Sequence, residues 1–514
     1  MVKVLGQDPI TLERERERVA AGTGNGDDQW AVAAADRRRR ENETPISVAL
    51  GAAAQSITGK NNGKSAKLTP LELLYPNLFS AKVEDGVATL KAHLATVPAE
   101  EHYGILEPLI RKHWKWFCLA APHLDFPEPK PIADGEKIRL ALRIHVLSHG
   151  GAERVVQLLA NHFAAKENFH VTIFIDSSQH GSIDYALHPA VELVPVDAPI
   201  DWRKQMEDHP QDLIICPQYW EIENYRDILL LKLLGARILA EEHGGPRRPA
   251  PFERRDEKNK HCAAIYSICD GLRCLTNDEL DQWRADGLEN CTCLANPVIF
   301  NAENTKRAPL NGKTILWIGR FASSHKRPEM AIRAFAKVLK KIPDARLVMA
   351  GECGGIYAKC CRDCKNLIRR LRIGHAVQIH EFQKDLTPYY SSGDLLLCSS
   401  SIEGYLCAAT EAKAFGVPIL STSMPYLTTL RRGAVTVPPD DENALAAEAV
   451  KLLLDRDRLK KLGDEARKDS IENFSDSVVF GRYDAFVEAI FRGNGAVREY
   501  CAAGPQPGEM KSAA

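Results

Sequence analysis

The sequence lacks an excess of charge of either sign. Its 67 basic side chains are balanced by 68 acidic ones, which leaves a formal net charge of −1 over 514 residues. A protein without a global electrostatic field has no general attraction for nucleic acid or for an anionic surface. We therefore expect no nucleic-acid partner, and any anion site must come from a local arrangement of basic side chains.

Long apolar runs are also missing. The longest, from Ile228 to Ala240, is interrupted by Lys232 and Arg237 and falls short of the roughly 20 residues that a membrane-spanning helix needs. Residues 1–20 are charged and lack the apolar core of a signal peptide. We expect a cytoplasmic protein that could still rest on a membrane surface as a peripheral contact.

The 14 cysteines follow no regular framework, so reduced thiols in a cytoplasm are the simplest account. One cluster contains Cys353, Cys360, Cys361 and Cys364. Four thiols could bind zinc in a tetrahedral site, but the second half of a two-knuckle pattern is missing and three of the thiols share one predicted helix. We favour small buried side chains here and expect no metal.

A chain of 514 residues is too long for one core, since a domain takes roughly 150 residues. Changes in composition and periodicity divide it into five parts. We predict a disordered N-terminal extension (1–66), a helical module with a linker (67–135), a first Rossmann-like domain (136–300), a second Rossmann-like domain with closing helices (301–493), and a flexible tail (494–514).

Strand-like and helical runs alternate through both long regions. The apolar run 138–147 leads into the turn Gly150-Gly151 and a helical pattern, and the run 313–319 opens a second unit of the same kind. Strand, glycine turn, helix and strand predict a doubly wound α/β domain, where ligands bind outside the carboxyl ends of the strands. The two-glycine turn lacks the full dinucleotide fingerprint, so it favours no particular ligand.

The stretch from Leu395 to Thr422 carries the strongest chemical signal. A buried strand is followed by a serine turn, by Glu403, and by a predicted helix that contains Glu411. Both carboxylates are expected to point into one crevice, where they can accept hydrogen bonds from hydroxyl groups. The amides of the first helical turn suit a phosphate lying between them; they belong to Gly404, Tyr405, Leu406 and Cys407. Hydroxyls at both ends and phosphate in the middle describe a nucleotide sugar.

Three motifs occur in order at predicted strand ends. They are Gly150-Gly151-Ala152-Glu153-Arg154, Gly319-Arg320-Phe321 with Lys326, and Glu403-Gly404 through Glu411. Together they resemble the retaining glycosyltransferases of family four (glycosyl transferases group 1), over residues 137 to 490. The resemblance implies the GT-B fold, in which an acceptor-side domain and a nucleotide-sugar-binding domain face a cleft.

The resemblance also implies a role for each matching residue. Arg320 and Lys326 match the basic pair that grips the donor diphosphate. Glu403 matches the acid that holds hydroxyls of the transferred sugar, and Glu411 the one that holds the nucleotide ribose. His243 lies where such enzymes place a histidine beside the sugar. The remaining donor-binding positions are Gly150, Gly151, Gly319, Gly404, Tyr405, Leu406 and Cys407.

The implied function is retaining transfer of a hexosyl group from a nucleotide-diphosphate sugar to a glycan or lipid-linked acceptor, in polysaccharide biosynthesis. The basic pair and helix amides would neutralise the leaving diphosphate, so no cofactor or divalent metal is required. Two alternatives stay open, a nucleotide-sugar hydrolase or epimerase on the same fold and a non-catalytic carbohydrate-binding module. The triplet Asp455-Arg456-Asp457 resembles a metal-binding motif, but its polar helical setting favours surface charge.

The sequence departs from the family pattern at two places. Tyr405-Leu406 follows Gly404 where the family usually shows Phe-Gly, and Arg327-Pro328 replaces the usual glycine after the loop lysine. Neither change removes a charge or a backbone donor other than the proline amide. Both changes alter the shape expected for the donor pocket.

Overall fold

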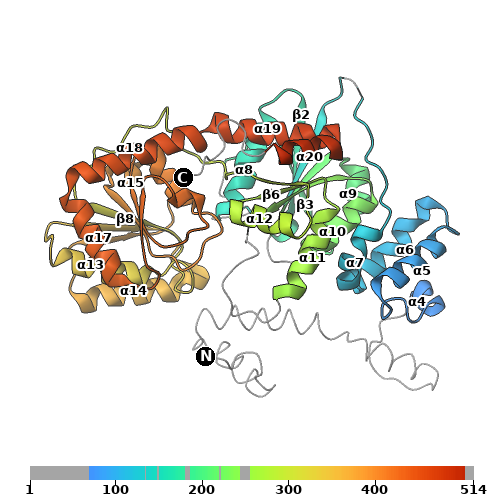
Figure 1. Cartoon of the computed structure of the whole chain (residues 1–514), viewed down its shortest axis with the longest axis horizontal. Helices are drawn as coiled ribbons and strands as arrows, with labels where there is room; N and C mark the ends of the chain where they lie inside the picture. Colours follow the sequence, from blue (N-terminus) through green and yellow to red (C-terminus); the bar gives the residue numbers. More distant parts are fainter. Residues whose placement is uncertain are drawn as a thin grey trace, which may run out of the picture.

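The computed structural model describes residues 69–133, 135–147, 150–179, 186–218, 222–243 and 255–503. The predicted extension over 1–66 lies outside these ranges. Two α/β domains lie side by side, with a small helical region against the first (Figure 1). Among the helices of the described ranges, none combines the length and the apolar character needed to cross a bilayer.

The first domain is built on a seven-stranded, all-parallel sheet with the strand order β3-β2-β1-β4-β5-β6-β7. Its strands are β1 (Ile138–Ile144), β2 (Phe169–Asp176), β3 (Val191–Val196), β4 (Leu213–Gln218), β5 (Arg237–Glu242), β6 (Gly271–Cys274) and β7 (Cys291–Cys293). The helices that connect them are α8 (Gly151–Ala164), α9 (Trp202–Asp208), α10 (Ile222–Leu233), α11 (Arg255–Ser267) and α12 (Asn277–Ala285).

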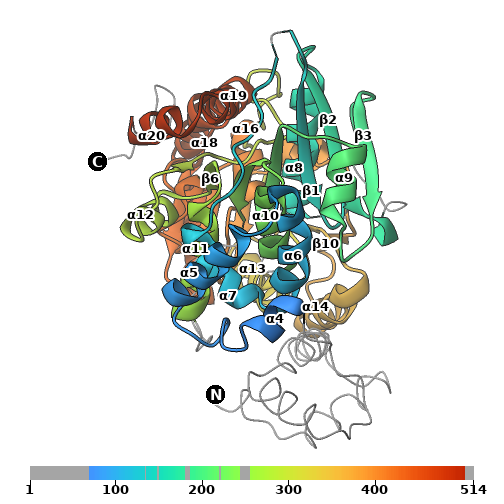
Figure 2. The same cartoon turned by 90° about the vertical axis from the view of Figure 1, so that its right-hand side faces the viewer.

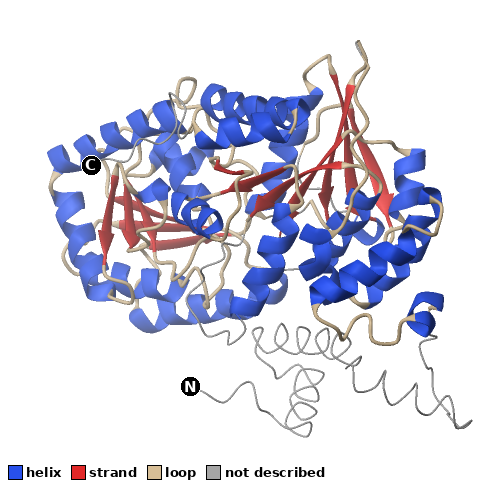
Figure 3. Cartoon of the chain, turned by 45° about the vertical axis from the view of Figure 1, so that its right-hand side comes forward, coloured by secondary structure: helices blue, strands red, loops and turns tan. Residues whose placement is uncertain are grey.

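The second domain has a six-stranded parallel sheet with the order β10-β9-β8-β11-β12-β13. Its strands are β8 (Thr314–Ile318), β9 (Arg346–Ala350), β10 (Val377–His380), β11 (Leu395–Cys398), β12 (Ile419–Thr422) and β13 (Ala434–Val437). Its helices are α13 (Pro328–Leu339), α14 (Ala358–Leu371), α15 (Thr387–Ser392), α16 (Cys407–Ala414), α17 (Glu442–Leu454) and α18 (Arg456–Asn473). Helices flank the strands in both domains (Figure 3), and both sheets are doubly wound, as predicted.

The central strands are buried on both faces. In β1, Leu140 and Leu142 belong to one hydrophobic cluster, whereas Ala141 belongs to the cluster on the opposite face of the sheet. All four residues of β11 are buried. This explains why both strands are continuous apolar runs in the sequence, because alternation is lost when helices cover both faces.

The helical region packs against the first domain. It consists of α4 (Pro70–Leu74), α5 (Val83–Leu94), α6 (Ala99–Lys112) and α7 (Trp114–Ala120). Leu109 and Phe117 share a hydrophobic cluster with Ile228 of α10 and Ile265 of α11, and Figure 2 shows these helices in front of the first domain. The helices therefore share a hydrophobic core with the first domain.

The last two helices leave the second domain and return to the first. They are α19 (Asp476–Arg492) and α20 (Asn494–Ala502). Tyr483, Phe486 and Ile490 of α19 join the cluster that contains Leu140 of β1, and α19 and α20 lie over the first domain in Figure 1. The flexible tail predicted from residue 494 therefore begins instead as a helix, whose Val497 is buried.

One cysteine pair differs from the reduced thiols that the sequence led us to expect. Cys353 follows β9 and Cys361 lies in α14, and the two form a disulfide with their Cα atoms 5.4 Å apart. The loop between β9 and α14 brings them together. Most of the other cysteines of the described residues are buried.

Candidate active site

Residues at the carboxyl ends of strands from both domains meet where the domains contact each other. In a doubly wound sheet, ligands bind where the strand order reverses, which is between β1 and β4 in one domain and between β8 and β11 in the other. Gly150 follows β1, Lys326 follows β8 and Glu403 follows β11. These three residues thus follow strands that flank the reversal points, whereas His243 follows β5.

Lys326 and Glu403 form an ion pair at this edge. Lys326 Nζ donates to Glu403 Oε1 at 2.6 Å, with the carboxylate side chain 8% exposed and the lysine 21% exposed. The sequence predicted both residues at one ligand site, and the structure brings them into direct contact. Gly319 lies alongside, since a Cβ on it would stand 3.4 Å from Lys326 Cδ.

Serine side chains and backbone amides hold the two loops together. Ser399 Oγ lies 2.8 Å from the Lys326 carbonyl oxygen, and the Ser401 amide donates to the His325 carbonyl at 2.8 Å. The first loop then enters α13 through Arg327, which adopts a left-handed conformation with φ of 52°, and through Pro328 at the first helical position. The proline fits this position because the first helical amide needs no partner within the helix.

Arg320 reaches solvent while it lies among acidic groups. Desolvation by the surrounding protein by itself lowers the pKa of the guanidinium. The neighbouring groups that favour its charge are Tyr357, Glu153, Glu352 and Glu403, and together they raise the pKa above its ordinary value. The guanidinium also lies 5.9 Å from the centre of the Tyr357 ring. Arg320 is therefore a permanent positive charge on the same side of the edge as Glu403.

Glu411 is buried and bonded to both domains. Tyr390 of α15 donates to Glu411 Oε2 at 2.8 Å, and Arg154 Nη1 of the first domain lies 3.2 Å from Oε1. Burial raises the pKa of Glu411, whereas the charge of Arg154 and the Tyr390 hydroxyl act in the opposite direction. Glu411 thus links the two domains through Arg154.

His243 is held by a buried carboxylate of its own strand. His243 Nε2 lies 3.3 Å from Glu241 Oε2, and Tyr483 of α19 donates to Glu241 Oε1 at 2.9 Å. Burial alone would raise the pKa of Glu241, but His243 and Arg273 hold it below the ordinary carboxyl value. The chain Tyr483–Glu241–His243 fixes the imidazole at the end of β5.

Close backbone approach explains one of the predicted glycines. A Cβ on Gly404 would stand 2.6 Å from the carbonyl oxygen of His243, which is nearer than any side chain allows. Gly151 lies near Cys407 at the start of α16, where a Cβ would stand at an ordinary contact distance of 3.6 Å from the Sγ atom. The loops after β1 and β5 therefore lie against residues 404–407 across the domain boundary.

The side chains of Tyr405 and Leu406 contribute to hydrophobic cores. Tyr405 joins the cluster of the first domain and Leu406 that of the second. Helix α16 begins at Cys407, so the predicted helix start at Gly404 was three residues too early. The chain bends at Gly404 before the helix begins, so that the side chain of Tyr405 reaches the first domain and that of Leu406 the second.

Several groups at the site carried no role in the sequence analysis. Glu153 and Arg154 belong to the glycine motif, three and four residues after Gly150. Their position in the first turn of a helix could have marked them as candidate site residues. Tyr390 and Glu241 had no comparable pattern. Asp455, by contrast, is exposed and caps α18 by accepting from the Arg458 amide at 3.0 Å.

The chain matches a known family over part of its length. Residues 312–455 match the family model described as Glycosyl transferases group 1. The matched range runs from the start of the second domain to the end of α17. It includes the second-domain residues of the site, namely Gly319, Arg320, Lys326, Glu403 and Glu411.

Curated relatives match a similar share of the chain. A D-inositol 3-phosphate glycosyltransferase of Corynebacterium diphtheriae is 28% identical over 185 residues, which are 34% of this chain and 43% of the relative. An N-acetyl-alpha-D-glucosaminyl L-malate synthase of Bacillus anthracis is 25% identical over 183 residues, 35% of this chain and 46% of the relative. An uncharacterized glycosyltransferase of Haemophilus influenzae is 30% identical over 156 residues, which are 30% of this chain and 42% of the relative. The chain spans less than half the length of each.

Solved structures resemble the chain over both domains. Sucrose-phosphate synthase from Thermosynechococcus elongatus superposes with a TM-score of 0.58 and 18% identity, covering 69% of this chain and 100% of that one. HepE of Anabaena, solved in complex with UDP and glucose, superposes with a TM-score of 0.57 and 13% identity. The match covers 68% of this chain and 100% of HepE. At these identities the likeness concerns the fold, which is GT-B.

Proposed function

We propose that this chain is a retaining glycosyltransferase that moves a hexosyl group from a nucleotide-diphosphate sugar to a glycan or lipid-linked saccharide acceptor. The observation that carries the proposal is the contact between Lys326 and Glu403 at the point where the strand order reverses. The family match over the second domain supports the transferase class. The names of the relatives do not favour a hydrolase, an epimerase or a carbohydrate-binding module. We also propose a cytoplasmic location and a role in polysaccharide biosynthesis.

The diphosphate of the donor would bind to Arg320 and Lys326. A guanidinium presents a fork of donors to phosphate oxygens, and an ammonium adds a compact charge. A donor that binds here exchanges the Lys326–Glu403 contact for two others, from the ammonium to phosphate and from sugar hydroxyls to the carboxylate. The short Lys326–Glu403 distance supports this exchange, because it places the two groups next to adjoining parts of one ligand.

The nucleotide ribose would bind to Glu411. An ionised carboxylate has about four acceptor positions, and Tyr390 and Arg154 take up two of them. The ribose hydroxyls can donate to the others. We place His243 beside the transferred sugar, where Glu241 fixes its ring, and the backbone of residues 404–406 beside the phosphates.

In the proposed reaction, the bond between the anomeric carbon and the diphosphate oxygen breaks, and its electron pair stays with the diphosphate. The acceptor hydroxyl oxygen forms the new bond on the same face, and its proton passes to the departing phosphate oxygen. The configuration at the anomeric carbon is therefore kept. Arg320, Lys326 and the start of α16 stabilise the charge that grows on the diphosphate, so this step requires no divalent metal.

Donor consumption with and without acceptor tests the proposal. Purified protein is incubated with UDP-, GDP- and ADP-sugars and a panel of glycan and lipid-linked acceptors, and the nucleotide product and the anomeric configuration are measured. Lys326→Ala and Glu403→Gln should each lower kcat/KM at least 100-fold, as is typical for groups that stabilise a transition state (about 10²–10³).

A second ion pair of the same domain provides matched controls. Lys337 Nζ lies 2.6 Å from Glu442 Oε1, the same distance as in the site pair, and this pair joins α13 to the start of α17. Lys337→Ala and Glu442→Gln should leave kcat/KM within about threefold, because a partly exposed ion pair outside the site contributes little. Equal activity of the site variants and the control variants would reject the site. Donor turnover that is independent of every acceptor would instead indicate a hydrolase.

A further inference from the structure

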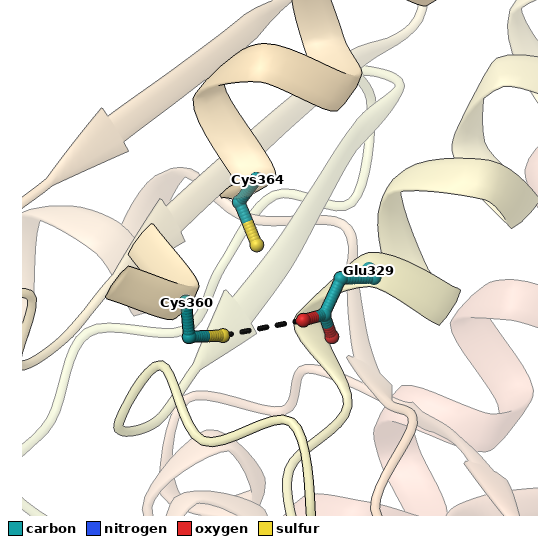
Figure 4. A group of neighbouring side chains, drawn as sticks. All are labelled: Glu329, Cys360 and Cys364. Atoms are coloured by element: carbon teal, nitrogen blue, oxygen red, sulfur yellow. Dashed lines mark hydrogen bonds between the residues drawn. The ribbon is translucent and has the colours of Figure 1, made fainter. Parts of the chain in front are cut away.

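Three side chains that can bind a metal converge outside the proposed active site. Glu329 lies in the first turn of α13, and Cys360 and Cys364 lie one turn apart on α14. The carboxylate oxygen and the two sulfur atoms all lie within 4.8 Å of one another. Figure 4 shows the three side chains pointing toward a common centre between the two helices.

Local geometry explains this convergence. Residues four apart on a helix share a face, so both thiols of α14 point toward the start of α13. Cys360 Sγ lies 3.3 Å from Glu329 Oε1, and Ser323 Oγ lies 3.1 Å from the same sulfur. Cys364 is fully buried, whereas Cys360 and Glu329 are half-buried. The cluster is therefore packed into the domain and reachable from solvent on one side.

The ligand atoms of the cluster, one carboxylate oxygen and two sulfurs, indicate which metal ions could bind. Thiolate ligands favour zinc and other soft ions, whereas magnesium and calcium require oxygen ligands. In a tetrahedral zinc site with bonds of about 2.0–2.3 Å, neighbouring ligand atoms stand roughly 3–4 Å apart, which small side-chain rotations would achieve here. We propose that Glu329, Cys360 and Cys364 bind one Zn²⁺, with water as the fourth ligand.

Binding would remove the protons of both thiols, which pass to solvent. This ligand set differs from the four thiols that the sequence offered as possible zinc ligands. Cys353 and Cys361 are joined to each other by a disulfide, and the third protein ligand is a carboxylate from another helix. Nothing in the spacing of the cysteines pointed to Glu329.

The ion would act on the neighbouring loop and not on the reacting atoms. Ser323, which contacts Cys360 Sγ and Glu329, lies in the loop between Arg320 and Lys326. An ion that joins the start of α13 to α14 would fix both helices beside this loop. Zinc should therefore stabilise the second domain and lower the mobility of the loop.

Metal binding to the full-length protein tests the site independently of transferase activity. Chelator-treated protein is incubated with Zn²⁺ alone, separated from free ion and analysed for metal, and its unfolding temperature is recorded. A parallel titration with Co²⁺ detects thiolate ligation by its charge-transfer absorption. The variants are Cys360→Ser/Cys364→Ser and Glu329→Gln, with Cys353→Ser/Cys361→Ser as the matched pair of thiols outside the ligand set.

The expected result is about one Zn²⁺ per chain in the wild type and in Cys353→Ser/Cys361→Ser, none in Cys360→Ser/Cys364→Ser, and an affinity at least tenfold weaker in Glu329→Gln. A wild type that binds no Zn²⁺ would overturn the proposal. So would binding that survives in Cys360→Ser/Cys364→Ser or is lost in the control pair. If the double variant fails to fold, a Co²⁺ complex of the wild type without thiolate absorption overturns it.

Discussion

The two domains have the same strand order around their reversal points but carry different chemistry there. The second domain presents a charged set, with Arg320 and Lys326 after β8 and Glu403 after β11. The first presents a glycine turn after β1 and an imidazole after β5, held by a buried carboxylate. The strand order therefore fixes where a ligand binds, and the loops decide which part of the ligand each domain receives.

Neither half is complete without the other. Arg154 of the first domain reaches Glu411 of the second, and Gly404 touches the backbone of His243. Helix α19 strengthens this dependence, because it follows the second domain in the chain but supplies Tyr483 to Glu241 in the first. We infer that the charged loops of the second domain act only when the first domain is packed against them.

The largest effect is expected where the charge of the second domain is removed. Arg320→Ala should lower kcat by about 10²–10³-fold, because a preorganised charge beside the leaving diphosphate is lost. Arg333→Ala, on α13 of the same domain, is the control, since its partner Glu442 lies away from the site. Steady-state kinetics with a saturating donor separate the two. An equal loss of kcat in Arg320→Ala and Arg333→Ala would show that Arg320 has no special role at this sheet edge.

The contact between the domains can be broken without changing any charge. Gly404→Ala would place a methyl group 2.6 Å from the His243 carbonyl oxygen and so force the domains apart. Overpacking of this kind costs about 1–3 kcal/mol, and kcat/KM should fall about 10- to 100-fold. Gly481→Ala in α19 is the control, because a Cβ there has no neighbour within 4 Å. Unchanged kinetics of Gly404→Ala would show that the contact is dispensable.

One buried acid from each domain illustrates two different environments. In the second, Asp469 is paired with buried Lys413, whereas in the first, burial and then the charge of Glu242 raise the pKa of Glu279 to about 8. Glu279 therefore contributes full stability below pH 4.5, the ordinary carboxyl value, and loses it as the pH rises through 8. Glu279→Gln should flatten this slope and stabilise the protein at pH 9 by about 1–3 kcal/mol.

Unfolding temperatures between pH 4.5 and 9 would measure this difference. The advantage of Glu279→Gln over the wild type should grow with pH. Glu289→Gln is the control, because this exposed side chain of the same domain pairs with Arg498 at the surface. A constant offset between Glu279→Gln and the wild type at every pH would contradict the buried, protonated carboxyl.

The smallest effect is expected at the ion pair that joins the domains. Arg154→Ala removes a charge that lowers the pKa of Glu411, so that carboxyl should stay protonated to higher pH. The KM for the donor should then rise about tenfold or less at pH 6 and hardly at pH 8. Arg154→Lys keeps the charge and should restore most of the loss. A KM ratio between Arg154→Ala and wild type that is the same at both pH values would exclude this role.

Much of the fold could be predicted because buried parallel strands are continuous apolar runs, as in β11. The resemblance placed Lys326 and Glu403 at one site, and the structure brings the two side chains into contact. The packing of α19 could not be predicted, because the helix follows the second domain in the chain whereas Tyr483 and Phe486 pack into the core of the first. The same limit applies to Tyr390, whose hydroxyl meets Glu411 through tertiary structure alone.

Element ends were the other source of error. The start of α16 was predicted at Gly404 but lies at Cys407, since Tyr405 and Leu406 pack into two different cores. The tail from residue 494 was expected to be flexible because it is small and polar, yet Val497 and Cys501 are buried and stabilise α20. In both cases, contacts with distant residues outweighed local composition.

We propose that loops of both domains form one donor site. Hydrogen exchange of the full-length protein with and without UDP, GDP and ADP tests this arrangement, because it reports protection segment by segment. One of these nucleotides should protect residues 150–154, 319–327 and 399–411 together, and Lys326→Ala should abolish the protection in all three. Protection confined to one domain, or to a different surface, would rule out a shared site.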